Sequence, residues 1–189
     1  LKMKVLKFGG SSVATSKNIQ KVLAIVSKSS EEQDVVVVVS AFGKTTNALI
    51  KGATLAAQKN EDYLEVLKEL ENNHFNIIKE LLPVKEQSSV NGYVKQRFNH
   101  LETIYEGCFL LRELSPKTLA KVSSFGELLS SYIISKAANE SFKAVYKDTR
   151  ELIVASDNYN NALVDFSATF KNCQEYFSSH SQKVTIVPG

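Results

Sequence analysis

A lysine, two glycines and two serines stand together near the start of the sequence, in the segment KFGGSS at Lys7–Ser12. Gly9 and Gly10 have no Cβ, so the backbone can turn sharply there and expose N–H groups. Such groups, followed by the N-terminus of a helix, bind anions such as phosphate, and Ser11 would add a hydroxyl donor. The ammonium of Lys7 could neutralise phosphoryl oxygens. A tight turn that caps a helix is the alternative, but a lysine at a strand's carboxyl end favours a ligand site.

A second segment, SAFGKTTN at Ser40–Asn47, follows a run of five valines. If the strands before both segments are parallel, its small and hydroxyl residues lie on the same sheet edge as the glycine turn. Ser40 and Thr46, with the N-terminus of the next helix, could hold a carboxylate there. A simple helix cap by Thr45 or Thr46 is the alternative, and the residues by themselves favour it.

Two established phosphate-binding motifs are excluded. No G-x-G-x-x-G pattern occurs, so a nicotinamide-binding turn is not indicated. The residues Gly43-Lys44-Thr45 resemble the end of a Walker A loop, but that motif requires a glycine where Val38 stands. The role of Lys44 is therefore open.

Glu127 stands in the otherwise apolar helical segment SFGELLS at Ser124–Ser130. A glutamate within an apolar stripe must pair with a positive group or face a cavity. The α-ammonium of an amino acid would suit it, and an exposed position at a helix N-terminus is the alternative. Arg150, in the segment DTR, could bind a carboxylate through two hydrogen bonds, or could simply pair with Asp148.

The elements that would position these residues begin with a βαβ unit. A short strand at 3–8 precedes the glycine turn, and apolar spacing predicts a helix over 17–30. The valine run at 34–39 cannot have one wet face, so we expect a strand buried on both sides, as in a parallel sheet covered by helices. The crossover between the two strands should be right-handed.

The middle of the chain, from 46 to about 139, shows almost only helical periodicity, with breaks at Pro83 and Pro116. We expect a helical excursion over roughly 59–113.

Strand-like segments return at 143–146, 152–155 and 184–187, and a helix over 167–179 precedes the last of them. Residues 1–189 therefore predict an α/β fold with a mostly parallel sheet covered by helices and a helix-rich insertion.

The composition excludes several classes of protein. The net charge of +3 comes from mixed basic and acidic residues without a basic block, so we expect no nucleic acid or membrane partner. Cys108 and Cys173 have no neighbouring ligand pattern, so we expect no disulfide framework and no metal site. The longest apolar run, five valines, is too short to span a bilayer, and we expect a soluble cytoplasmic protein. The histidines His74, His100 and His180 are expected to have surface or packing roles.

Three segments in the same order and separation resemble aspartate kinases, of the amino-acid-kinase superfamily. Lys7–Val13 resembles the opening signature K-F-G-G-[ST]-S-[VL]. Ser40–Asn47 resembles S-A-x-x-x-x-T-N, and Gly126–Ser130 resembles G-E-[RLK]-[LM]-S. Asp148-Thr149-Arg150 also resembles a D-x-R element of the family.

The resemblance implies transfer of the γ-phosphoryl group of ATP, with Mg²⁺, onto the side-chain carboxylate of L-aspartate, which gives an acyl phosphate. By resemblance, the nucleotide phosphates would contact Lys7, which is also the catalytic residue, and Gly9, Gly10 and Ser11. The amino acid would contact Ser40, Thr46, Glu127 and Arg150.

The segments 104–111 and 150–154 resemble the bifunctional aspartokinase–homoserine dehydrogenase type more closely than monofunctional forms. NADP would be a cofactor only if a dehydrogenase domain follows, and we expect a homo-oligomer for the full-length protein. The chain stops at Gly189, before the G-R-G-G-S-D loop of the family, so we expect an incomplete, inactive N-terminal portion on the substrate side. The alternatives are a non-catalytic ligand-binding or assembly module of the same fold, or a related kinase for another substrate.

Overall fold

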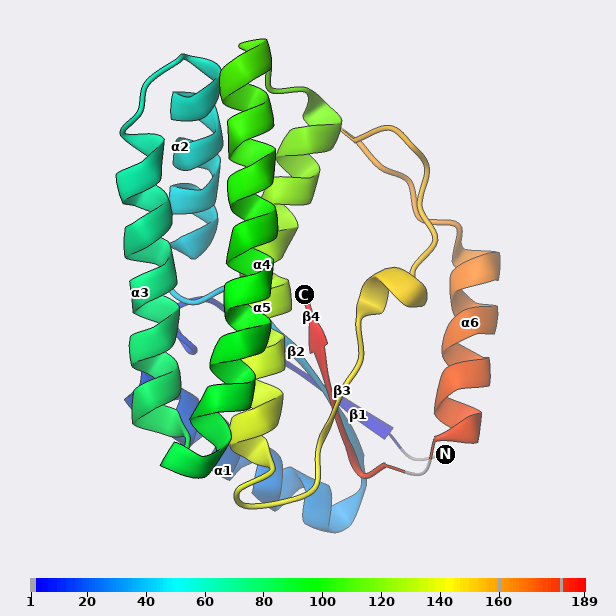
Figure 1. Cartoon of the computed structure of the whole chain (residues 1–189). Coiled ribbons are helices and arrows are strands. Elements are labelled where there is room, and N and C mark those ends of the chain that lie inside the picture. The colour runs from blue at the N-terminus through cyan, green and yellow to red at the C-terminus, as the bar shows by residue number, and fades with distance from the viewer. Residues whose placement is uncertain (1–2, 160, 181) are drawn as a thin grey trace.

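The computed structural model describes residues 3–159, 161–180 and 182–189. Four strands form one parallel sheet in the order β1-β2-β4-β3 (Figure 1). Their bounds are Met3–Phe8 for β1, Asp34–Val39 for β2, Val145–Tyr146 for β3 and Val184–Pro188 for β4. The prediction of an α/β fold with a mostly parallel sheet is confirmed.

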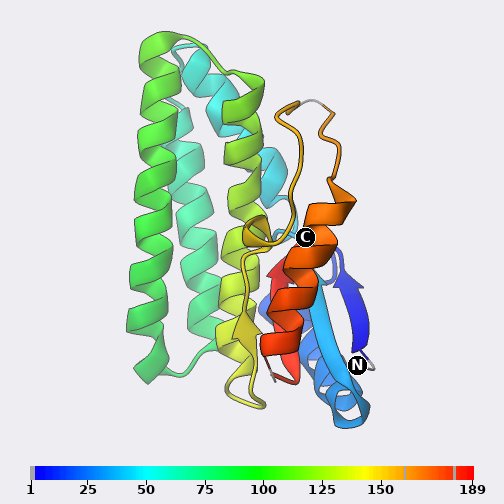
Figure 2. The ribbon, with the colours of Figure 1, turned by 90° about the vertical axis from the view of Figure 1, so that its right-hand side faces the viewer.

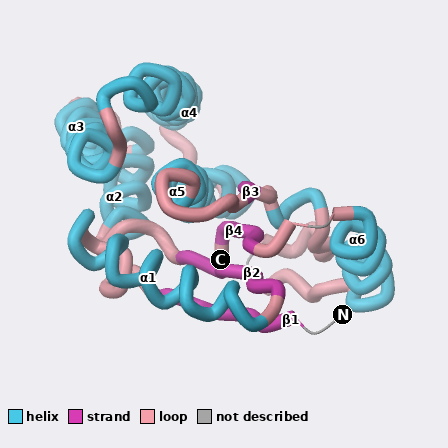
Figure 3. The backbone as a smooth tube through the Cα atoms, turned by 90° about the horizontal axis from the view of Figure 1, so that it is seen from below, coloured by secondary structure: helices cyan, strands magenta, loops and turns pink. Residues whose placement is uncertain are grey.

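Helices cover both sides of this sheet. They are α1 Ser16–Glu32, α2 Thr45–Ala57, α3 Tyr63–Leu81, α4 Val84–Leu111, α5 Pro116–Ala138, α6 Phe166–Ser179 and the short 3-10 helix η1 Thr149–Glu151. Helices α1 and α5 lie on one side of the sheet and α6 on the other (Figure 3). Helices α2 to α5 form a bundle that extends well beyond the sheet (Figure 2). Within the described residues, no helix combines the length and apolar character that crossing a membrane would need.

Strand β2 lies at the centre of the core. Its residues Val35, Val36, Val37 and Val39 are at most 8% exposed. The strand pairs with β1 on one edge and β4 on the other, so that Val37 stands between Leu6 and Ile186. A run of apolar residues fits this position because neither face of the strand meets water, as the valines predict.

Two of the three prolines stand at the start of helices. Pro83 is the residue before α4, and Pro116 is the first residue of α5. A proline has its φ angle fixed near the helical value and lacks the N–H group that a helix start leaves unpaired, so it suits this place. The predicted breaks at these residues are confirmed, and α3 and α4 occupy the range 59–113.

Close packing joins α2 to α4 within the bundle. The Tyr105 hydroxyl donates to the Leu49 carbonyl oxygen at 2.7 Å, and Tyr105 is fully buried. Its ring lies directly over Gly52, where an added Cβ would come within 2.8 Å of the ring. The glycine therefore allows α2 and α4 to approach each other.

The prediction of a strand over 152–155 is wrong. The segment follows η1 without regular structure, and Ala155 forms only an isolated antiparallel bridge with Val164. Side chains of α6 satisfy its backbone instead: the Val154 N–H donates to Thr169 Oγ1 at 3.0 Å, and Asn172 Nδ2 donates to the Leu152 carbonyl at 3.1 Å. The sequence suggested a strand because the side chains of this segment favour β structure. The polar partners on α6 could not be recognised, because they lie far along the chain.

Candidate active site

The glycine turn and the hydroxyl-rich loop lie side by side at the carboxyl edge of the sheet. Because β1 and β2 are parallel and in register, both segments leave the sheet at the same level. The Ser40 N–H donates to the Phe8 carbonyl at 3.0 Å, and the Gly43 N–H donates to the Gly10 carbonyl at 3.1 Å. The Gly189 N–H donates to the Val39 carbonyl at 3.0 Å, which brings the end of β4 to the same edge.

The two glycines of the turn have different surroundings. A Cβ on Gly10 would lie 3.0 Å from the carbonyl oxygen of Gly43 and 3.1 Å from that of Ala41, so the close approach of the two loops requires a residue without a side chain. A Cβ on Gly9 would meet nothing within 4 Å, and Gly9 is exposed. Gly10 therefore joins the two loops, whereas the backbone at Gly9 is open to a ligand.

Lys7 and Ser11 are both exposed at this edge. Lys7 takes part in no ion pair within the described parts of the chain, so its ammonium is available to an anion. The turn itself is closed by the Ser12 N–H, which donates to the Gly9 carbonyl at 2.9 Å. These positions fit the phosphate contacts expected of Lys7, Gly9 and Ser11, and those contacts stay predictions.

The glycine turn does not lie at the N-terminus of α1, the helix that follows it in the sequence. Helix α1 begins only at Ser16 and is capped by Thr15, whose Oγ1 accepts from the Asn18 N–H at 3.3 Å. Helix α2 begins at Thr45, and the preceding Lys44 gives it no side-chain cap. The N–H groups near Thr46, in the first turn of α2, receive no side-chain cap, and a carboxylate could satisfy them.

Glu127 reaches the hydroxyl-rich loop from α5. Its Oε1 lies 3.4 Å from the Ala41 nitrogen, and the Ser130 hydroxyl donates to the Ser40 carbonyl at 2.8 Å. Gly126 makes this approach possible, because a Cβ there would lie 2.6 Å from the Ala41 Cβ. Glu127 is half-buried and pairs with no cation in the part of the chain that the structure describes. Its carboxylate therefore lies at Ala41, the residue after Ser40, with capacity for an ammonium group.

Arg150 pairs with Asp148. The guanidinium Nε lies 3.0 Å and Nη2 lies 2.6 Å from the two carboxylate oxygens. Partial burial by itself would raise the pKa of Asp148, but the hydrogen bonds and charge of Arg150 outweigh it and lower that pKa. Thr149 Oγ1 donates to the Pro188 carbonyl at 3.2 Å, so this segment also stands at the carboxyl edge. The alternative structural pair is present, and a substrate contact by Arg150 stays a prediction.

His74 supports the hydroxyl-rich loop from the other side. It is fully buried in α3, and its ring lies between Phe42 and Phe98, with ring centroids 5.4 Å and 5.3 Å away. Its Nδ1–H donates to the Leu70 carbonyl at 2.7 Å, and burial lowers its pKa to about 4. The role is packing, one of the two that the sequence indicates. Its contact with Phe42 was missed, although its spacing from Leu70 places both on one helical face.

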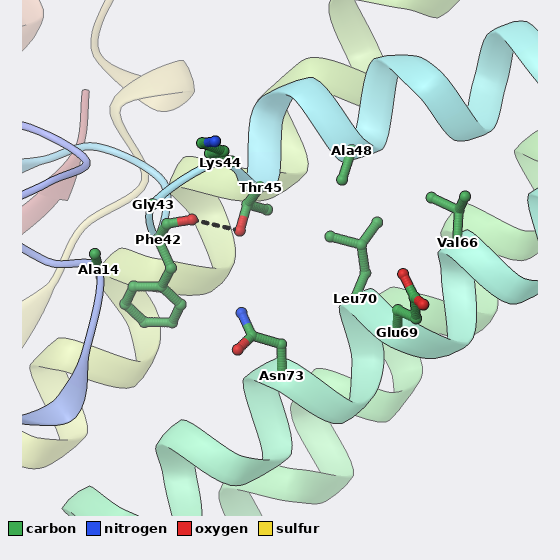
Figure 4. Close-up of a pocket in the computed structure, with 10 residues that line it drawn as sticks. All are labelled: Ala14, Phe42, Gly43, Lys44, Thr45, Ala48, Val66, Glu69, Leu70 and Asn73. Atoms are coloured by element: carbon green, nitrogen blue, oxygen red, sulfur yellow. Dashed lines mark hydrogen bonds between the residues drawn. The ribbon is translucent and has the colours of Figure 1, made fainter.

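A cavity of about 270 Å³ lies between this loop and α3 (Figure 4). It is lined by Ala14, Phe42, Gly43, Lys44, Thr45, Ala48, Val66, Glu69, Leu70 and Asn73. None of the predicted phosphate or substrate contacts lines it. The cavity is therefore separate from the cluster around Ser40 and Glu127, which lies on the α5 side of the loop.

Comparison with known families gives a direct assignment. A model of the amino acid kinase family matches residues 2–189. The chain belongs to that family. Among curated proteins, it is 30% identical over 177 residues to a bifunctional aspartokinase/homoserine dehydrogenase of Buchnera aphidicola, covering 91% of this chain and 22% of that protein. It is 32% identical over 193 residues to the chloroplastic aspartokinase 1 of Arabidopsis thaliana, covering 98% of this chain and 32% of that protein.

Solved structures share the fold. Aspartokinase III of E. coli in complex with aspartate and ADP superimposes with a TM-score of 0.88 at 22% identity, over 100% of this chain and 40% of that one. The same enzyme with lysine and aspartate gives a TM-score of 0.85 at 23% identity, over 99% of this chain and 40% of that one. The expected resemblance to aspartate kinases is confirmed, and this member of the amino acid kinase family spans less than half the length of these relatives.

The described ranges contain no group of three or more His, Cys, Asp or Glu side chains that could hold a metal ion. The donors at the carboxyl edge are instead an ammonium, hydroxyls and backbone N–H groups, which suit phosphate and carboxylate.

Proposed function

We propose that this chain forms the phosphate-contacting and amino-acid-binding part of an aspartate kinase, which transfers the γ-phosphoryl group of ATP to the side-chain carboxylate of L-aspartate. The observation that carries the proposal is the position of Glu127 against Ala41, directly beside the loop that is hydrogen-bonded to the glycine turn. A carboxylate that suits an amino group and a lysine that suits a phosphate thus share one sheet edge. The aspartate and ADP bound to the E. coli relative agree with this pairing of ligands.

On the nucleotide side, Lys7 would bring positive charge to the oxygens of the transferring group. The open backbone at Gly9 and the Ser11 hydroxyl would donate hydrogen bonds to phosphate. Gly10 would act on the phosphates through the loop geometry that its close contact with Gly43 maintains. Mg²⁺, bound to the nucleotide phosphates, would neutralise further charge.

On the amino-acid side, the Glu127 carboxylate would accept the α-ammonium of L-aspartate. Ser40, Thr46 and the uncapped N-terminus of α2 would donate to a carboxylate of the substrate. Arg150 would reach a carboxylate with the part of its guanidinium that Asp148 leaves free. These contacts would hold the side-chain carboxylate in line with the γ-phosphorus.

The reaction needs no covalent bond to the protein. A carboxylate oxygen of aspartate attacks the γ-phosphorus, the bond to the oxygen between the β- and γ-phosphorus atoms breaks, and ADP leaves with the electron pair. The products are an aspartyl acyl phosphate and ADP. Positioning and charge neutralisation supply the catalysis in such transfers.

Glu127→Gln tests the amino-acid site by calorimetric titration of the chain with L-aspartate. The neutral amide loses the charge that attracts the ammonium, so we expect binding to weaken by about tenfold or more. Glu140→Gln, an exposed position just after α5, is the matched control and should bind aspartate like the wild type. Equal affinities in all three proteins would contradict the proposal.

Turnover separates the catalytic proposal from a binding module of the same fold. The chain spans 40% of the solved aspartokinase, so we expect it to bind ligand without turning it over. The measurement is ADP release from MgATP with and without L-aspartate. Release that depends on aspartate would show that the isolated chain is active and would contradict this expectation.

A further inference from the structure

The cavity between the hydroxyl-rich loop and α3 carries chemistry that the proposed reaction does not use. Its volume of about 270 Å³ lies just below that of typical drug-sized ligand pockets, so it suits a smaller molecule. Its floor is apolar and consists of Phe42, Ala48, Val66 and Leu70. Phe42 is 1% exposed and is fixed by the neighbouring ring of His74, so this floor is part of the folded core.

The polar groups of the cavity stand on two facing walls. Lys44 and Thr45 come from the start of α2, and Glu69 and Asn73 come from α3 across the cavity (Figure 4). The Thr45 hydroxyl is already engaged, because it donates to the Phe42 carbonyl at 2.6 Å. Lys44 and Glu69 form no ion pair with each other or with another side chain in the ranges that the structure describes.

A cavity that has a lysine on one wall, a glutamate on the other and an apolar floor between them defines a ligand class. We propose that this cavity binds a small zwitterion with an apolar side chain, such as an apolar amino acid. Its ammonium would pair with Glu69, its carboxylate with Lys44, and its side chain would pack against the apolar floor at Ala48, which is partly exposed. This gives Lys44 a role that the phosphate motifs do not provide.

The cavity and the amino-acid site proposed at Glu127 both adjoin the start of α2, but they share no lining residue. Glu127 and Ser130 contact the loop at Ala41 and Ser40, from α5. The cavity instead uses residues 42–45 of the same loop and is closed by α3. The inference therefore does not depend on the proposed kinase function.

The test is an NMR titration of the ¹⁵N-labelled chain with L-leucine. We expect saturable shifts of the Gly43, Thr45 and Ala48 amide signals, with a dissociation constant on the order of 1 mM for so small a ligand. Glycine lacks the apolar side chain, isoamylamine lacks the carboxylate, and 4-methylpentanoate lacks the ammonium. Each should bind at least about fivefold more weakly, because each loses one of the three contacts.

Variants at exposed positions locate the site. Glu69→Gln should weaken leucine binding about fivefold, and Glu65→Gln, one turn earlier on α3 and outside the cavity, should not change it. Glu127→Gln should also leave the leucine titration unchanged. No saturable shift at about ten times the expected constant would overturn the proposal. Equal leucine affinity in Glu69→Gln and the wild type, or weaker binding in Glu127→Gln, would overturn it as well.

Discussion

The carboxyl edge of the sheet and the helical bundle are held together by different interactions. At the edge, main-chain hydrogen bonds join the loops, and Gly10 and Gly126 make room for them by having no side chain. In the bundle, large side chains such as His74 and Tyr105 fill the space between helices. The edge therefore depends mainly on main-chain hydrogen bonds, and the bundle mainly on the packing of large side chains, for which Gly52 makes room beside Tyr105.

Because of this difference, substitutions in the two regions should affect different properties, namely the geometry of the candidate site and the stability of the fold. Added atoms at the edge would move the loops that carry the candidate site. Substitutions in the bundle would act first on stability, because burial of an aromatic side chain contributes more to the free energy of unfolding than a single loop hydrogen bond does.

The largest expected effect is the pH dependence of stability that His74 creates. Its pKa is about 4 in the folded chain and 6.5 ordinarily, so the unfolded chain binds more protons between these values. The contribution of neutral His74 to the free energy of unfolding is therefore fully present above about pH 6.5 and is lost as the pH falls toward 4. At about 1.4 kcal/mol per pKa unit, the loss approaches about 3 kcal/mol.

Denaturant unfolding of the wild type and of His74→Phe at several pH values measures this effect. The phenylalanine keeps an aromatic ring beside Phe42 and removes Nε2, which has no hydrogen-bond partner among the described residues. The variant should be less sensitive to pH between 6.5 and 4, while the titration of carboxylates persists in both proteins. Identical pH slopes in the two proteins would contradict a buried neutral histidine.

The second prediction concerns Gly126, where the edge meets α5. In Gly126→Ala the new Cβ would lie 2.6 Å from the Ala41 Cβ, so the loop or the helix must shift. We expect a loss of about 2 kcal/mol in the free energy of unfolding, as for other overpacked sites, and weaker aspartate binding at Glu127.

Gly92→Ala is the matched control, because Gly92 is in α4 and a Cβ there would meet nothing within 4 Å. Alanine favours helix over glycine, so this variant should gain about 1 kcal/mol. Thermal unfolding and aspartate titration of both variants decide the matter. If Gly126→Ala were as stable as Gly92→Ala, the close approach of α5 to the loop would be incorrect.

The sequence predicted the edge well for a physical reason. The valines of β2 require cover on both faces, a parallel sheet places successive loops on one edge, and KFGGSS and SAFGKTTN follow those strands directly. The position of Glu127 beside Ser40 came from resemblance, since periodicity places Glu127 on a helix but does not say which loop that helix meets.

The bundle side was harder to predict, because its contacts join residues far apart in the chain. Local spacing shows that His74 and Leu70 share a face, but it does not show that Phe42 packs on that face. The same limit explains the missed cavity, whose walls come from α2 and α3. The segment near Leu152 was predicted as a strand because its residues are apolar. Its polar partners on α6 also lie far along the chain, so the local pattern did not show them.

The smallest expected effect on stability comes from the ion pair between Arg150 and Asp148. The Arg150 side chain is 55% exposed, so Arg150→Gln should cost only about 0.5 kcal/mol of unfolding free energy. Its effect on aspartate binding is the informative measurement. If Arg150 contacts the substrate, Arg150→Gln weakens binding while Asp148→Asn, which releases the guanidinium, does not. If both variants weaken aspartate binding equally, the pair positions the segment after β3, and Arg150 is then no substrate contact.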